Sequence, residues 1–163
     1  MAVLTTSFQK IATGANTTVG SARGYLEVWA KYNSQNVANN TTNYTVELRL
    51  VVTAGYFGNY QSTPYSVSGT GLTTKNGDIG SGSHRSQTLG SVTGNVTHNN
   101  DGTKSITGSG SLNLTAWGIT LSASGSATLP TIPRASTITA TNADIGSATT
   151  ININIASSTF THT

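Results

Sequence analysis

Three consecutive segments between Gln87 and Leu129 decide the fold class of this chain. In each of them, apolar residues or glycines alternate with hydroxyl or amide residues. The apolar or glycine positions are Val92, Gly94 and Val96, then Ile106, Gly108, Gly110, Leu112 and Leu114, then Ile119, Leu121, Ala123, Gly125, Ala127 and Leu129. A period of two residues is typical of β-strands that bury one face and expose the other. The pattern therefore predicts three such strands.

The first two segments are joined by His98-Asn99-Asn100-Asp101-Gly102-Thr103. Asn, Asp and Gly tolerate positive φ, so a tight hairpin is predicted here, with Asp101 capping backbone amides. The structural turn residues are then Asn99, Asn100, Asp101 and Gly102. The segment lacks the alternating oxygen ligands and the distal Glu of an EF-hand, so it predicts no metal site. Asn76-Gly77 is expected to form another turn.

The N-terminal half alternates in the same way, with strands expected at residues 4–13, 21–32 and 43–53. Long polar loops join these runs, and no segment shows the period of a helix. An all-β fold follows. Residues 1–129 are expected to form an antiparallel β-sandwich that is jelly-roll-like in type.

Two prolines, Pro130 and Pro133, predict a stiff, extended linker over residues 130–136. Beyond it, Ile138 and Ala140 begin a new alternating pattern, which continues in the run 151–155. Residues 137–163 are therefore interpreted as the start of a second β-sandwich, Ig/fibronectin-like in type. Such a domain needs about 90–100 residues, so a continuation beyond residue 163 is expected.

The composition excludes several classes of function. The net charge of +3 comes from eight scattered Lys and Arg residues, without the basic cluster of a nucleic-acid site. The chain has no cysteine, which excludes disulfides and thiolate metal sites. No apolar run approaches the length of a membrane span. We expect no nucleic-acid partner, no membrane insertion and no cofactor.

Catalytic residues are also scarce. The acidic residues are Glu27, Glu47, Asp78, Asp101 and Asp144. Two of them lie mid-strand beside cations and one lies in the predicted turn. A glycosidase pair that includes Asp78 has no further support in the sequence. The histidines show no metal-ligand spacing and are expected at exposed turns or strand ends: His84, His98 and His162. The sequence predicts a protein that is not an enzyme.

A binding site has more support, because aromatic residues gather in and after the loop 54–64. Sugars stack their C–H faces on aromatic rings, while Asn, Gln and Arg side chains bind the hydroxyl groups. The candidate ligand-binding residues are Trp29, Tyr56, Phe57, Tyr60, Tyr65 and Arg85. In the alternative interpretation, the same aromatics close the open end of the sandwich. Trp117, in a predicted hairpin turn, is interpreted as a packing anchor.

Two motifs resemble a known family. They are Thr97-His98-Asn99-Asn100-Asp101-Gly102-Thr103-Lys104 and the run from Ala127 to Ser136, which contains Leu129-Pro130-Thr131-Ile132-Pro133-Arg134-Ala135. Together with residues 156–163, they resemble the minor structural proteins of siphophage tails that infect Gram-positive bacteria. The resemblance covers the second half of the chain. It implies a virion protein at the tail tip or baseplate, built of tandem β-sandwiches and bound to other tail proteins. Several copies would follow the tail symmetry.

Three functions are weighed on this basis. The first is a non-enzymatic structural protein of the phage tail that anchors to the tail and contributes to host attachment. The second is a carbohydrate-binding module that recognises host cell-wall polysaccharide. The third is a bacterial surface adhesin, which requires a secretion signal or sorting motif. The first residues lack the charged and apolar regions of a signal peptide, which favours a virion protein made in the host cytoplasm.

Overall fold

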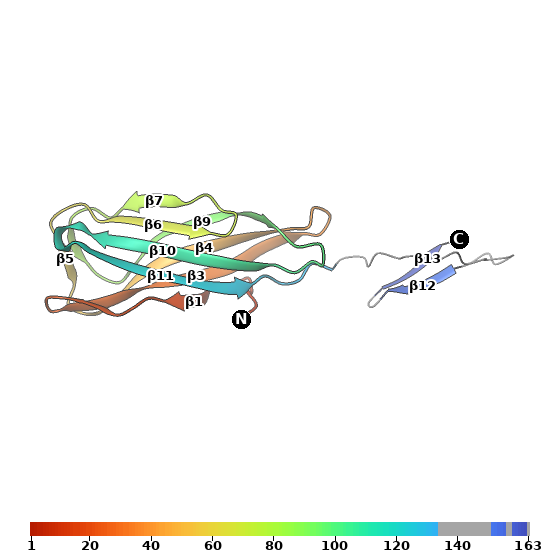
Figure 1. The fold of residues 1–163 in the computed structure, drawn as a ribbon, viewed down its shortest axis with the longest axis horizontal. Helices are drawn as coiled ribbons and strands as arrows, with labels where there is room; N and C mark the ends of the chain where they lie inside the picture. The colour runs from red at the N-terminus through yellow and green to blue at the C-terminus, as the bar shows by residue number, and fades with distance from the viewer. Residues whose placement is uncertain (134–150, 156–157, 163) are drawn as a thin grey trace. The chain divides into compact units, whose positions relative to one another are not determined.

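A computed structural model describes residues 1–133, 151–155 and 158–162 of the chain. The chain divides into two compact units, Met1–Ile132 and Pro133–Thr163. The described residues are dominated by β-strands, which confirms the predicted all-β class (Figure 1). None of the helical turns in these ranges has the length and apolar character to cross a bilayer.

The first unit contains two main antiparallel sheets. One has five strands, in the order β1 (Gln9–Thr13), β3 (Ala22–Asn36), β4 (Thr41–Ala54) and β9 (Gln87–Thr97), with β2 (Thr17–Val19) also paired to β3. The other has the order β11 (Ile119–Thr128), β10 (Ser105–Leu114), β6 (Pro64–Gly69) and β7 (Lys75–Asp78). A small ribbon pairs β5 (Phe57–Asn59) with β8 (Gly82–His84).

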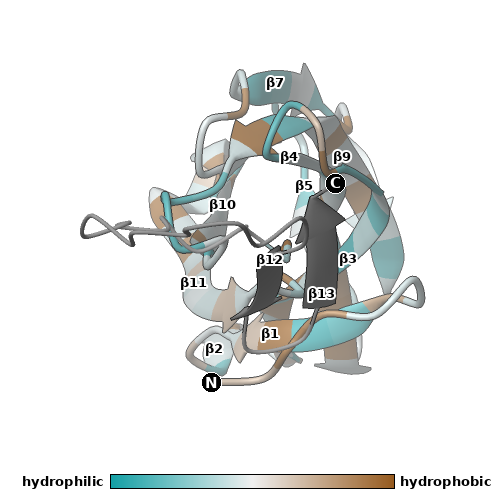
Figure 2. Ribbon diagram, turned by 90° about the vertical axis from the view of Figure 1, so that its right-hand side faces the viewer, coloured by the Kyte–Doolittle hydropathy of each residue, from teal (hydrophilic) through white to brown (hydrophobic). Residues whose placement is uncertain are grey.

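The core lies between the two sheets. Seen along the strands, β10 and β11 lie on one side of the interior and β3, β4 and β9 lie on the other (Figure 2). Alternate residues of both sheets face inward, as the period of two predicts. Fully buried examples are Leu26 and Val28 on β3, Leu48 on β4, and Ile106 and Leu112 on β10. These strands therefore bury the faces that the sequence pattern predicts.

The predicted hairpin between the first two segments of the alternating region is wrong. β9 pairs with β4 in the five-stranded sheet, whereas β10 pairs with β11 and β6 in the other sheet. The connection from His98 to Lys104 crosses between the sheets, which lie about 10 Å apart in packed sandwiches. Both strands still bury one face in the same core, so the alternation looks identical in either arrangement.

His98 anchors this crossing and is buried, contrary to the predicted exposed position. Its Nδ1–H donates to the Gly102 carbonyl oxygen at 2.7 Å, which leaves Nε2 to accept from the Thr42 hydroxyl at 2.8 Å. The predicted role of Asp101 is confirmed, because its Oδ1 accepts from the Thr103 N–H at 2.9 Å. Hydrogen bonds from Thr103 lower the pKa of Asp101.

Glycines let the two sheets approach at their edges. A methyl group on Gly125 of β11 would lie 2.2 Å from the Ile11 carbonyl oxygen on β1. At another edge, a methyl group on Gly90 of β9 would lie 2.8 Å from the ring of Tyr65 on β6. Within the second sheet, a methyl group on Gly77 of β7 would lie 2.4 Å from the same ring. The predicted Asn76-Gly77 turn is wrong, because both residues lie within β7 and pair with β6. A glycine in a strand can mark a close approach instead of a turn.

The first unit continues past residue 129. Leu129 and Ile132 are both buried, and the Ile132 N–H donates to the Gly102 carbonyl oxygen at 3.0 Å. The segment predicted as a linker, 130–136, thus begins inside this unit. In the second unit, β12 (Ile151–Ile155) pairs antiparallel with β13 (Ser158–His162). Ile138 and Ala140 lie outside the described residues, and the jelly-roll and Ig-like types stay predictions.

Candidate functional site

Three aromatic side chains are exposed at one end of the first unit. The exposed fractions are 49% for Tyr56, 76% for Tyr60 and 51% for Trp117, and no other aromatic side chain in the described part of the chain is exposed to this extent. Tyr56 precedes β5, Tyr60 follows it, and Trp117 ends the 3-10 turn η1 (Thr115–Trp117) between β10 and β11. We call these three residues the aromatic end.

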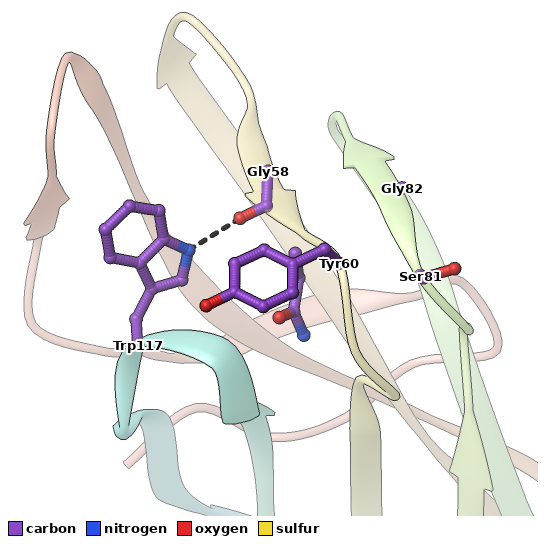
Figure 3. A pocket seen from close by; sticks show the side chains of 6 residues that line it. Gly58, Tyr60, Ser81, Gly82 and Trp117 are labelled. Atoms are coloured by element: carbon purple, nitrogen blue, oxygen red, sulfur yellow. Dashed lines mark hydrogen bonds between the residues drawn. The ribbon is translucent and has the colours of Figure 1, made fainter.

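Trp117 is fixed by the edge of its indole ring. Its Nε1–H donates to the Gly58 carbonyl oxygen of β5 at 2.6 Å, and the ring of Tyr60 lies close by (Figure 3). Gly118, with a φ of +62°, ends the turn that carries the indole. The predicted hairpin between β10 and β11 is confirmed. Trp117 is only in part the packing anchor that was predicted, because half of its side chain remains exposed.

Two open pockets adjoin at this indole. The first, of about 470 Å³, is lined by Gly58, Asn59, Tyr60, Ser81, Gly82 and Trp117 (Figure 3). The second, of about 340 Å³, is lined by residues that include Val19, Ala22, Gly55 and Tyr56, together with the same Gly58 and Trp117. The two pockets therefore share one wall, formed by the indole and the strand to which it is bonded.

A buried polar network supports the loops that carry the aromatic end. Its members are Asn59, Thr63 and His84, with exposed fractions of 2%, 0% and 5%. The Thr63 hydroxyl donates to the Gly80 carbonyl oxygen at 2.6 Å, because a carbonyl can only accept. The same hydroxyl then accepts from Asn59 Nδ2 at 2.7 Å and from His84 Nε2–H at 3.1 Å. One hydroxyl thus joins three segments of the chain.

The network also reaches the turn of Trp117. Asn59 Oδ1 accepts from the Ala116 N–H at 3.1 Å, and the Thr115 hydroxyl donates to the Ser62 carbonyl oxygen. Since Asn59 and Ala116 are 57 positions apart in the sequence, these bonds hold η1 against the loop that follows β5. The positions of Tyr60 and Trp117 are therefore set together.

His84 is buried in this network, so its predicted exposed position is wrong. Burial lowers the pKa of His84, and the charge of Asp78 and a hydrogen bond with the Gly80 backbone only partly oppose this. Asp78 serves the same loop, since its Oδ1 accepts from the N–H groups of Thr63 and Gly80 at 2.8 and 2.7 Å. The supporting roles of His84 and Asp78 were not predicted from the sequence, because isolated polar residues in a loop are more often exposed.

Among the other predicted ligand-binding residues, Arg85 lies at the aromatic end. Its guanidinium carbon is 5.8 Å from the centre of the Tyr56 ring, and its side chain is exposed. Phe57 is 1% exposed and belongs to the core, so it presents no surface to a ligand. Tyr65 is half-buried, and its ring packs closely against Gly77 and Gly90. Phe57 thus fits the alternative interpretation, in which the aromatics close the end of the sandwich, whereas Tyr56 and Tyr60 are exposed.

Trp29 belongs to a different surface, the outer face of the five-stranded sheet. The guanidinium carbon of Arg49 lies 4.3 Å from its ring centre, and its Nε1–H donates to Glu27 at 2.8 Å. Burial alone would raise the pKa of Glu27, but hydrogen bonds from Lys10 and Trp29 hold that pKa below its ordinary value. Because Arg49 stacks on the indole, Trp29 offers less free aromatic surface than Trp117 does.

The carboxylates of the described residues are engaged in structural contacts. Glu27 and Glu47 form ion pairs with Lys10 and Arg49 at 2.9 and 2.6 Å, and Asp78 and Asp101 accept hydrogen bonds from backbone amides. Within the ranges that the structure describes, no three His, Cys, Asp or Glu residues come together as a metal site. Asp144 lies outside those ranges, and nothing is described for the side chain of His162.

Comparison with known proteins gives one finding. Searches among curated proteins and among solved structures return no match. Residues 15–163 match the sequence model of a family described as "Siphovirus protein of unknown function (DUF859)". The predicted origin in a siphophage is confirmed at this level, while the location in the tail stays a prediction. Since the match spans most of the sequence, the chain belongs to this siphovirus protein family.

Proposed function

We propose that the protein is a non-enzymatic structural component of the siphophage tail, anchored to a neighbouring protein at the tail tip or baseplate. Membership of a siphovirus family supports the assignment to a phage particle. The engagement of the described carboxylates in ion pairs and backbone caps supports a structural role over a catalytic one.

The observation that carries the proposal is the arrangement of the first unit. Val3 bridges to Thr128, and Ile132 packs next to the crossing turn, so the chain enters and leaves this unit at one end. The ten residues of β11 run from that end back to η1, a distance of about 33 Å at the usual rise per residue. β5 lies at the far end of the sandwich in Figure 1. The unit acts as a spacer that presents the aromatic end.

A second function, recognition of host cell-wall polysaccharide, is favoured by the aromatic end itself. The indole of Trp117 uses its N–H within the protein and leaves the rest of the ring half-exposed. An apolar ring surface beside peptide groups and hydroxyls matches the C–H faces and hydroxyls of a sugar. Tail anchoring through the end where the chain enters and leaves the unit would be compatible with glycan recognition at the aromatic end.

The location is tested by immunogold electron microscopy of intact particles, with an antibody raised against the full chain. Label at the distal end of the tail is the expected result. Particles without label, from a lysate in which the antibody detects the free protein, would refute a virion location.

The recognition function is tested by sedimentation of the full chain with host cell walls. We expect co-sedimentation with intact walls, and loss of binding when the polysaccharide is chemically removed. A double variant, Tyr56→Ala with Tyr60→Ala, should bind at least about tenfold more weakly, a loss of about 1.4 kcal/mol. Thr131→Val, an exposed change at the opposite end of the unit, is the control. Unchanged binding by the double variant would refute recognition through this end.

A further inference from the structure

We infer that the aromatic end is a two-subsite oligosaccharide site, in which Trp117 separates two consecutive sugars and Arg85 binds an anionic substituent on one of them. This inference rests on the second proposed function, recognition of cell-wall polysaccharide, and names the ligand class that the same site takes.

The two subsites follow from the adjoining pockets. Their volumes, about 470 and 340 Å³, each lie in the range of about 300–1,000 Å³ that is usual for small-molecule sites. Both are open, and both are walled by Trp117 and Gly58. A ligand that fills both must pass across the indole, so it is a chain of at least two units and not a single sugar.

Each subsite combines one tyrosine with accessible peptide groups. Tyr60 lines the first pocket beside Ser81 and Gly82, and Tyr56 lines the second beside Gly20. A methyl group added to Gly20 or Gly82 would contact nothing within 4 Å, so the backbone at these two positions is open to a ligand. Peptide N–H and C=O groups next to an aromatic ring suit the hydroxyls of a pyranose.

A positively charged side chain lies beside the second subsite. Arg85 extends over the ring of Tyr56, which belongs to this pocket. Asp78, the acidic residue of the supporting loop, directs its Oδ1 at two backbone N–H groups. An exposed guanidinium binds carboxylate and phosphate oxygens through paired hydrogen bonds. The favoured ligand therefore carries a carboxylate or a phosphodiester on the sugar in the second subsite, beside Tyr56.

Calorimetric titration of the full chain tests the inference. The probes are fragments of one to six sugars released from host cell-wall polysaccharide by mild acid, separated into neutral, phosphate-bearing and uronate-bearing fractions. We expect affinity to rise at least about tenfold from one sugar to two, with little further gain. We also expect one anionic fraction to bind about tenfold more tightly than the neutral fraction of equal length.

Variants assign the two subsites. Tyr56→Ala should abolish the gain from the second sugar while the affinity for one sugar is kept. Arg85→Gln should remove the preference for the anionic fraction, and Lys104→Gln, at the opposite end, is the charge control. Trp117→Ala could fail to bind because it folds poorly, so Trp117→Phe is a second variant. It keeps an aromatic ring and loses only the bond to Gly58. Loss of binding in the alanine variant with partial binding in the phenylalanine variant is expected.

The outcomes separate this inference from the function on which it rests. If fragments of every length bind equally and Tyr56→Ala has no effect, the two-subsite inference fails while glycan recognition stands. If the protein binds neither walls nor fragments, recognition and inference fail together. If Trp117→Ala abolishes binding to another tail protein and not to walls, the aromatic end is a protein interface and the inference is overturned.

Discussion

Thr63→Val probes the buried network that supports the aromatic end. Valine has nearly the same shape as threonine, and residue 63 is fully buried, so the substitution removes one hydroxyl without creating a cavity. That hydroxyl donates to Gly80 and accepts from Asn59 and His84. After the change, Asn59 Nδ2 keeps its bond to the Ser62 carbonyl oxygen, and Gly80 is partly accessible to water. His84 Nε2–H keeps no partner from this network.

The cost follows from these three groups. An unsatisfied buried donor costs about 1–3 kcal/mol, and each lost hydrogen bond adds about 0.5–1.5 kcal/mol. The new methyl group recovers about 0.8 kcal/mol by burial. With the first cost for His84 and the second for each of the other two groups, the unfolding free energy should fall by about 1–5 kcal/mol. With a urea dependence of about 2 kcal/mol per molar, the midpoint should fall by about 0.5–2.5 M.

Urea unfolding followed by far-ultraviolet circular dichroism measures this change in the full chain. Thr53→Val is the matched control, because Thr53 is exposed and makes one long hydrogen bond, at 3.3 Å, to the Arg23 carbonyl oxygen. We expect its midpoint to move by less than about 0.3 M. If Thr63→Val and Thr53→Val shift the midpoint equally, the network does not stabilise these loops as argued.

Three further predictions concern packing and pH. Gly110→Ala places a methyl group 2.6 Å from both δ carbons of the buried Leu48. We expect the unfolding free energy to fall by about 1–3 kcal/mol and the melting temperature in calorimetry to fall by about 3–10 °C. An unchanged melting temperature would contradict the close packing of the sheets. The pKa of His84 is lower in the folded chain than in the unfolded chain. As the pH decreases through about 6.5, the unfolded chain therefore takes up a proton at His84 before the folded chain does, and stability should fall. His84→Gln keeps a donor toward Thr63 and does not titrate, so its urea midpoint should depend less on pH between about 7.5 and 5.5; an equal dependence in both proteins would exclude this role. The lowered pKa of Glu27 provides stability that is present above about pH 4.3 and is lost as the pH falls through its folded value, so Glu27→Gln should flatten the acid limb of the stability curve. If the wild type and Glu27→Gln lose stability in parallel as the pH falls, the ion pair between Glu27 and Lys10 does not stabilise the fold.

The faces of the strands could be predicted from the sequence, because alternation is a local property. Leu26 and Val28, or Ile106 and Leu112, face the core whichever strand lies beside them. The partner of each strand could not be predicted, since β9 and β10 show the same pattern whether they pair with each other or lie in opposite sheets. The connection after β9 has the composition of a hairpin turn. Its actual geometry depends on His98, whose partner Thr42 is 56 positions away.

The candidate site was predicted in part for the same reason. The loop 54–64 was identified by its aromatics, and Tyr56 and Tyr60 are exposed in the structure. Phe57, between them, is buried, because successive residues of β5 face opposite sides. Trp117 joins this loop only through tertiary contacts, and the burial of Thr63 and His84 depends on the same contacts. A single sequence shows the residue types but not which distant segments meet.

The most direct test of the account uses the absence of cysteine from the chain. Phages would be built with Ser81→Cys at the aromatic end or Thr131→Cys at the opposite end, both exposed positions, and intact virions would be labelled with maleimide-gold. We predict label on the tail for Ser81→Cys, protection of Thr131→Cys by the neighbouring tail protein, and slower adsorption of the phage labelled at residue 81. Protection of residue 81 in the virion, or unchanged adsorption after its labelling, would contradict a tail protein that presents its aromatic end to the host.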